Sequence, residues 1–128
     1  MSDPGYERGM EVRREVLGNE YVDDASANSS NFTHDFQGFI TRYAWGEVWA
    51  RPGLDRRTRS CITLSILAAL GCDDELALHV RAALGNGVTP EEIQEVLLHT
   101  SIYAGVPRAG SAFSIAQAVL IEDESEEL

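Results

Sequence analysis

The chain has 128 residues, 44% of them hydrophobic, and carries a formal net charge of −11. This length predicts one domain with a sizeable core, and the acidic balance argues against nucleic acid and anionic membranes, which attract basic surfaces. No apolar run approaches the roughly 20 residues that cross a bilayer, and the charged N-terminus does not resemble a signal peptide. We therefore expect a cytoplasmic protein with no membrane or nucleic-acid partner.

All ten basic residues are arginines. Arginine captures carboxylates through a planar, bidentate arrangement of donors. Two explanations of the acidic, lysine-free composition stay open at this point. One is a GC-rich genome, and the other is adaptation to high salt, where an acidic surface keeps a protein in solution.

The first half of the chain predicts two helices separated by polar sequence. Asp3 and Pro4 form a helix start, and this helix extends to Gly18. The polar stretch 19–31 predicts a connection with about one helical turn. The next helix begins at Thr33 and ends near Gly46, with apolar residues at helical spacing, namely Phe36, Phe39, Ile40 and Tyr43. We interpret 47–53 as a loop, since the residue before Pro52 favours extended geometry.

The second half predicts four helices. Asp55 caps the first, which ends before Gly71; its segment 61–70 is apolar on nearly every face, which indicates burial in a core or at a subunit interface. Asp73 or Asp74 caps the second, and 85–87 ends it in left-handed geometry.

Thr89, Pro90 and Glu92 form a capping box at the start of the third helix of this half. A break at 105–107 precedes the last helix, and we expect residues 1–3 and 122–128 to be frayed. No segment alternates as a strand does. The sequence thus predicts an all-α single compact domain over 1–128, with about six helices and assembly through the buried helix.

His79 lies in the apolar first half of its helix, and two interpretations of it stay open. It is either a core or interface histidine bonded to a carbonyl or carboxylate, or a general acid or base whose pKa suits neutral pH. Glu75, one turn earlier, would make a metal pair with it, but no third ligand is evident and we predict no metal site. We interpret His34 and His99 as structural or exposed.

The second candidate region is 43–59, which holds both tryptophans, one carboxylate and four arginines. These residues are Trp45, Glu47, Trp49, Arg51, Arg56, Arg57 and Arg59. Such a cluster suits a small, flat, anionic ligand, although exposed ion pairs would also explain the arginines. Cations in the first turn of a helix are disfavoured by the macrodipole. We therefore expect anionic partners for Arg56, Arg57 and Arg59, from a ligand or from a neighbouring chain.

Two segments, YAWGEVWARPGLDRRTRS (43–60) and ELALHVRAALGNGVTPEEIQEVLLHTSIYAGVP (75–107), carry a family resemblance. With REVLGNEYVD (14–23), they resemble the 4-carboxymuconolactone decarboxylase family within the alkylhydroperoxidase D-like superfamily. Redox members of that superfamily carry a CxxCxxxH motif, whose cysteines would fall here at Cys72 and Glu75. They also tend to carry a glutamate at the position of Ser60. Without a dithiol, an intramolecular thiol peroxidase or disulfide reductase activity is disfavoured.

The resemblance implies an enzyme, a carboxy-lyase of aromatic catabolism (the β-ketoadipate pathway) that needs neither a metal nor an organic cofactor. It would convert γ-carboxymuconolactone to β-ketoadipate enol-lactone and CO2, as a homotrimer or homohexamer. We assign Arg51 and Arg56 to the substrate carboxylates, and His79 to proton delivery or to the oxyanion. Glu47 would orient His79 or relay the proton, and Trp45, Trp49 or Tyr103 would form a dry wall.

Three alternatives stay open beside this reading. The first is a redox enzyme that uses Cys72 between subunits. The second is a helical domain that only assembles. The third is a decarboxylase or lactone enzyme of the same branch with a related substrate.

Overall fold

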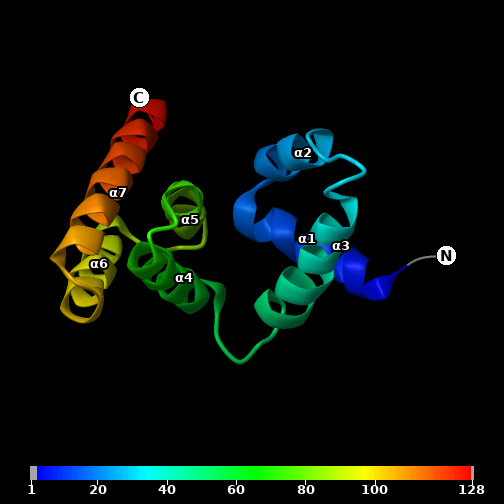
Figure 1. Cartoon of the computed structure of the whole chain (residues 1–128), viewed down its shortest axis with the longest axis horizontal. Helices are drawn as coiled ribbons and strands as arrows, with labels where there is room; N and C mark the ends of the chain where they lie inside the picture. The colour runs from blue at the N-terminus through cyan, green and yellow to red at the C-terminus, as the bar shows by residue number, and fades with distance from the viewer. Residues whose placement is uncertain (1–2, 128) are drawn as a thin grey trace. The chain divides into compact units, whose positions relative to one another are not determined.

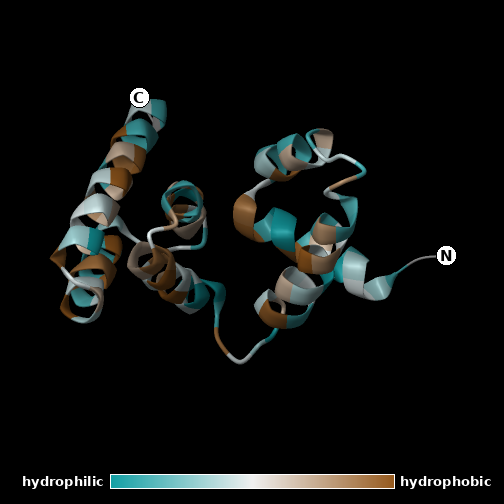
Figure 2. Cartoon of the chain, viewed as in Figure 1, coloured by the Kyte–Doolittle hydropathy of each residue, from teal (hydrophilic) through white to brown (hydrophobic). Residues whose placement is uncertain are grey.

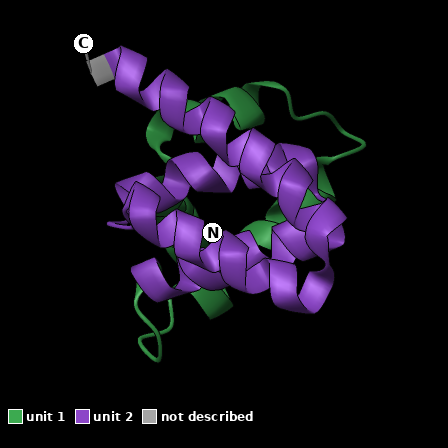
Figure 3. Ribbon diagram, turned by 90° about the vertical axis from the view of Figure 1, so that its left-hand side faces the viewer, with its two compact units in different colours: residues 1–56 green, residues 57–128 purple. Residues whose placement is uncertain are grey.

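The computed structural model describes residues 3–127, which form seven α-helices and one π-helix and contain no strand. The predicted all-α class is confirmed, with more helices than expected. The chain divides into two compact units, residues 1–56 and 57–128, shown in green and purple in Figure 3. The single-domain organisation stays a prediction. No helix within the described part of the chain has the length and apolar character needed to cross a membrane.

Unit 1 (residues 1–56) contains α1 (Pro4–Leu17), α2 (Asn19–Ala27), α3 (His34–Ile40) and the π-helix η1 (Thr41–Trp49), as labelled in Figure 1 except for η1, which continues α3. The predicted start of α1 is confirmed, because the Asp3 carboxylate accepts a hydrogen bond from the Tyr6 backbone N–H at 3.1 Å. Gly18 ends α1 with a positive φ of 92°.

Glycines allow α1 and η1 to pack at unusually short range. A Cβ atom built on Gly9 would lie 2.0 Å from the Thr41 carbonyl oxygen, and one on Gly46 would lie 2.8 Å from the Gly5 carbonyl oxygen. The adjoining core of unit 1 holds Val12, Val16 and Trp45. Neither glycine has a positive φ. Their function is therefore to remove side-chain volume between two helices, as small residues do wherever helix backbones approach closely.

Two predictions for unit 1 are wrong. Residues 19–31 were expected to be a connection, but 19–27 form α2, anchored by the fully buried side chain of Val22. Gly46 was expected to end its helix, with a loop from 47; instead the helix continues to Trp49. In both cases packing overrides the local sequence. The polar sequence of α2 is helical because Val22 is buried, and Gly46 does not end its helix because it packs closely against α1.

Unit 2 (residues 57–128) contains most of α4 (Arg56–Leu70), with α5 (Asp73–Gly85), α6 (Pro90–Ala104) and α7 (Val106–Glu127). Side chains from all four helices form its core, including Leu64, Leu76, Val80, Ile93, Leu97, Ala112 and Val119. The predicted capping box is confirmed: Thr89 Oγ1 accepts from the Glu92 N–H at 3.1 Å, and the Glu92 side chain accepts from the Thr89 N–H at 3.0 Å.

The expected cap of α5 needs correction. Cys72 occupies the N-cap of α5 without a side-chain hydrogen bond, so the two aspartates lie inside the first turn, where carboxylates favour the macrodipole. α7 extends as far as residue 127, and the expected fraying from 122 stays a prediction. Residue 3 caps α1, and the other ends expected to fray, residues 1–2 and 128, lie outside the described residues.

α4 buries only part of its surface within unit 2, so the burial of its other face at a subunit interface stays a prediction. One face, with Ser60, Leu64 and Ala68, is buried, whereas Ile62 and Ile66 are 43% and 51% exposed. In Figure 2 the arginine-rich start of α4 is teal and much of the rest is brown.

Two glycine substitutions should have opposite effects, because Gly9 lies in the contact between α1 and η1 whereas Gly110 has open space around it. Gly9→Ala should destabilise the protein by about 1–3 kcal/mol, because the methyl group overlaps backbone that cannot rotate away. Gly110→Ala on α7, where nothing lies within 4 Å of the added atom, should stabilise it by up to about 1 kcal/mol through helix propensity. Urea denaturation followed by circular dichroism measures both. Equal effects of the two substitutions would contradict the close approach.

Candidate functional site

The predicted site residues are distributed over both units. Unit 1 carries Trp45, Glu47 and Trp49 on η1, Arg51 in the following loop and Arg56 at the start of α4. Unit 2 carries His79 on α5 and Tyr103 on α6. The pairing of Glu47 with His79 therefore joins residues of different units and stays a prediction.

The π-helical geometry of η1 brings the two tryptophans together. Their ring centroids lie 5.2 Å apart at an interplanar angle of 32°. Trp45 is only 7% exposed and belongs to the core of unit 1, against which Trp49 and Ala50 pack. Glu47, between them in sequence, is exposed. π-Helical turns are rare and are frequently found at functional sites. This one holds the aromatic pair on one face, while Glu47, two residues from each ring, lies on another.

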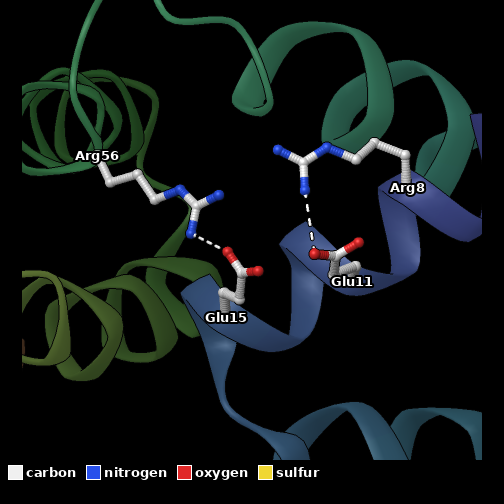
Figure 4. A network of polar contacts seen from close by, with 4 residues as sticks. All are labelled: Arg8, Glu11, Glu15 and Arg56. Carbon is white, nitrogen blue, oxygen red and sulfur yellow. Dashed lines mark hydrogen bonds and ion pairs between the residues drawn. The ribbon is translucent and has the colours of Figure 1, made fainter.

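Two of the arginines at the start of α4 have carboxylate partners within the same chain. Arg56 Nη1 donates to Glu15 Oε2 on α1 at 2.5 Å, a contact drawn in Figure 4 together with the Arg8–Glu11 pair. Arg57 pairs with Glu92 of α6. The expectation that a ligand or a neighbouring chain supplies the anions is therefore wrong for these two arginines. The carboxylates of Glu15 and Glu92 offset the unfavourable macrodipole instead.

His79 is partly buried, and its Nδ1 atom is closed off from solvent. Burial lowers its pKa below the ordinary value of 6.5, and the negative charge of Glu75 opposes that shift in part. The imidazole is therefore predominantly neutral at pH 7. It has one ring N–H to donate and one nitrogen to accept.

The other candidates of unit 2 lie near its surface. Tyr103 is exposed, and its ring lies 5.3 Å from the ring of His99, which is exposed as expected. Cys61 and Cys72 are both free thiols. Within residues 3–127, no three His, Cys, Asp or Glu side chains gather closely enough to bind a metal ion, so Glu75 and His79 have no third ligand.

Each unit also contains a cavity. The cavity of unit 2, about 430 Å³, lies along α6 and α7 and includes none of the predicted site residues. The cavity of unit 1, about 440 Å³, is lined by Arg13, a residue that the sequence analysis missed. Arg13 is only 6% exposed, and burial lowers the pKa of its guanidinium. The missed signal was its spacing, because residues 9, 12, 13 and 16 form one buried helical stripe.

Comparison with known proteins identifies the family. Residues 34–118 match the carboxymuconolactone decarboxylase family model. The chain is 52% identical over 114 residues to a 4-carboxymuconolactone decarboxylase of Acinetobacter baylyi, covering 89% of this chain and 85% of that one. It is 44% identical over 115 residues to the nitrosuccinic acid decarboxylase npaB of Metarhizium robertsii, covering 90% and 80%.

A more distant similarity reaches the redox branch. The chain is 26% identical over 125 residues to the alkyl hydroperoxide reductase AhpD of Corynebacterium aurimucosum, covering 88% of this chain and 66% of that one. The family match and the two higher identities decide the assignment. The chain is a member of the carboxymuconolactone decarboxylase family.

Proposed function

We propose that this protein is a cofactor-free decarboxylase that converts γ-carboxymuconolactone to β-ketoadipate enol-lactone and CO2. The observation that carries the proposal is the 52% identity, over most of both chains, to a relative named for that substrate. The relative named for nitrosuccinic acid favours a second candidate, decarboxylation of a different small carboxylic acid at the same site. Turnover of the two acids by the purified protein, compared by kcat/KM, distinguishes them.

The chemistry of the lactone explains why the protein's own side chains suffice for the reaction. The leaving carboxylate sits on the ring carbon vinylogous to the lactone carbonyl. When its C–C bond breaks, the electron pair moves through the ring double bond onto the carbonyl oxygen, and CO2 departs. The resulting dienolate then takes one proton at the α carbon. The enzyme must therefore hold two carboxylates, stabilise one oxyanion and allow one proton to arrive.

We assign His79 to the oxyanion. A neutral imidazole donates a hydrogen bond without first losing a proton, and burial keeps His79 neutral at pH 7. A preorganised donor of this kind accelerates reactions by roughly 10²–10³. Glu47 is exposed, so its carboxylate can exchange protons with water, and we assign it to the proton relay.

Arg51 and Arg56 remain the proposed ligands of the substrate carboxylates. Arg56 already pairs with Glu15, so it would contact a substrate only after this carboxylate is displaced. We propose Arg51 as the other ligand of the substrate carboxylates, with the paired rings of Trp45 and Trp49, and Tyr103, as the apolar wall. A dry wall favours decarboxylation because the charged carboxylate loses its hydration there.

Removal of His79 should reduce turnover without unfolding the protein. For His79→Ala we expect kcat to fall by about 10²–10³ while the helical circular dichroism spectrum is kept. His79→Gln, which retains an N–H donor, should keep more activity than His79→Ala. Arg81→Gln removes an exposed ion pair on the same helix and serves as the control. Near wild-type turnover of His79→Ala would remove His79 from the mechanism.

The pH dependence of activity tests which protonation state of His79 is active. Burial lowers its pKa, so the neutral form persists down to a pH below 6.5. If the neutral form is active, kcat/KM stays level from pH 8 to 6.5 and falls only at lower pH, as the imidazole gains a proton. The fall should be absent from the residual activity of His79→Gln. A kcat/KM that instead rises as the pH falls through this range would assign the imidazolium as a proton donor to carbon.

We further propose that the chain assembles into a homotrimer or homohexamer through α4. Ile62, Ile66 and Leu70 recur at every fourth position, and each is at least 43% exposed in the single chain. Such a row of large apolar side chains is typical of an interface. A second copy of α4 is the proposed occupant. The predicted cytoplasmic location stays a prediction.

A positive charge introduced into this row should dissociate the assembly. Ile66→Arg is expected to elute as the 14.0 kDa chain in size-exclusion chromatography with light scattering, while the wild type elutes at a multiple of that mass. Ile121→Arg on α7 changes an isoleucine of similar exposure, 55% against 51%, and should leave the mass unchanged. A monomeric wild type, or equal effects of the two substitutions, would refute assembly through α4.

A further inference from the structure

We propose that the cavity of unit 1 is a binding site for a small carboxylate anion, which Arg13 recognises. The site consists of the side chains around this cavity on α1, α2, α3 and η1. None of the residues assigned above to decarboxylation lines it. The inference therefore does not depend on the proposed function.

The first step is the incomplete partnering of Arg13. Its side chain is 94% removed from solvent, and Nη1 donates a long hydrogen bond of 3.3 Å to Gln37 Oε1, which is a neutral acceptor. Its Nε is buried and has no hydrogen-bond partner among the described residues. Arginine keeps its charge inside proteins. A buried guanidinium without a neighbouring anion lowers the stability of the folded protein. An anion bound at Arg13 would remove this cost.

The second step is the contrast with other arginines of the same unit. Arg8, Arg14, Arg42 and Arg56 each lie within 4 Å of a carboxylate oxygen, namely of Glu11, Asp23, Asp3 and Glu15. All four are more exposed than Arg13. No ion pair to a described carboxylate is formed by Arg13, although burial makes a counter-charge most valuable there.

The third step is the space beside it. The cavity measures about 440 Å³, within the range of small-molecule sites. Its polar lining includes hydroxyl, amide, imidazole and guanidinium groups, from Tyr6, Ser26, Ser29, His34, Gln37 and Arg42. Asp3 is the one carboxylate among the lining residues, and it already pairs with Arg42 at 3.6 Å. The lining thus leaves one positive charge, that of Arg13, without compensation.

These features select the ligand class. A guanidinium binds a planar carboxylate through two parallel N–H donors, and hydroxyl groups supply further donors to the same oxygens. A small mono- or dicarboxylate matches both the charge and the volume. Two sources have this chemistry: the carboxylated substrate of the enzyme itself, or a separate carboxylate metabolite that acts as an effector.

The test supplies the missing anion from within the chain. Gln37→Glu places a carboxylate where Nη1 of Arg13 already donates. This variant should melt at a higher temperature than the wild type in buffer without organic acids. Succinate at constant ionic strength should raise the melting temperature of the wild type, by mass action, and bind Gln37→Glu about tenfold or more weakly. Succinamide, the neutral analogue, should bind neither.

Matched variants make the outcome specific. Gln117→Glu introduces the same charge on the exposed surface of α7 and should respond to succinate as the wild type does. Arg13→Gln should show no rise in melting temperature with succinate. If this variant does not fold, two other measurements test the proposal: succinate binding by Gln37→Glu, and the succinate-induced shift of the Arg13 Nε–Hε signal in NMR. Equal succinate affinity of wild type and Gln37→Glu, or no response in either, would overturn the proposal.

Kinetics then separate the two sources. If Gln37→Glu raises the KM for γ-carboxymuconolactone along with its succinate dissociation constant, the cavity holds a carboxylate of the substrate. If the KM is unchanged while succinate binding is weakened, the site serves a separate carboxylate. Either result supports the site. The test of the site itself does not require the decarboxylase assignment to hold, because succinate binding is measured without turnover.

Discussion

The short contact between α1 and η1 positions the candidate residues that these two helices carry. Gly9 and Gly46 let two helix backbones approach to distances that no side chain would allow. This approach places the Thr41 carbonyl against α1, at the first turn of the π-helix. Trp45, Glu47 and Trp49 follow on η1, and Arg13 and Glu15 extend from α1. A change of even one methyl group at this contact shifts all of them together.

Burial has different chemical results at two basic side chains, the partly buried His79 and the buried Arg13. His79 responds by losing its proton, since a ring with an ordinary pKa of 6.5 becomes neutral at small cost. Arg13 has no such response, because its guanidinium keeps its charge even when desolvated. The same physical effect therefore makes His79 a neutral hydrogen-bond donor and leaves Arg13 as a buried charge that an anion would stabilise.

Much of the fold follows from local signals in the sequence. The caps at Asp3 and Thr89 and the bounds of α4 were predictable, because capping and proline chemistry act within a few residues. The helix α2 was not predictable, since its sequence is mostly polar and holds a single buried residue, Val22. The partners of Arg56 and Arg57 were not predictable either, because Glu15 and Glu92 lie 41 and 35 positions away along the chain, and no local pattern encodes such pairs.

The first turn of α4 has one more property. Arg56 is bonded to a glutamate of the first compact unit, and Arg57, the next residue, is bonded to a glutamate of the second. The boundary between the units thus falls inside a continuous helix rather than in the irregular stretch of 50–55. A cut in the stretch 50–55 would leave α4 whole, but it would separate Arg56 from its partner Glu15. The two units are therefore poor candidates for modular exchange, although each has its own core.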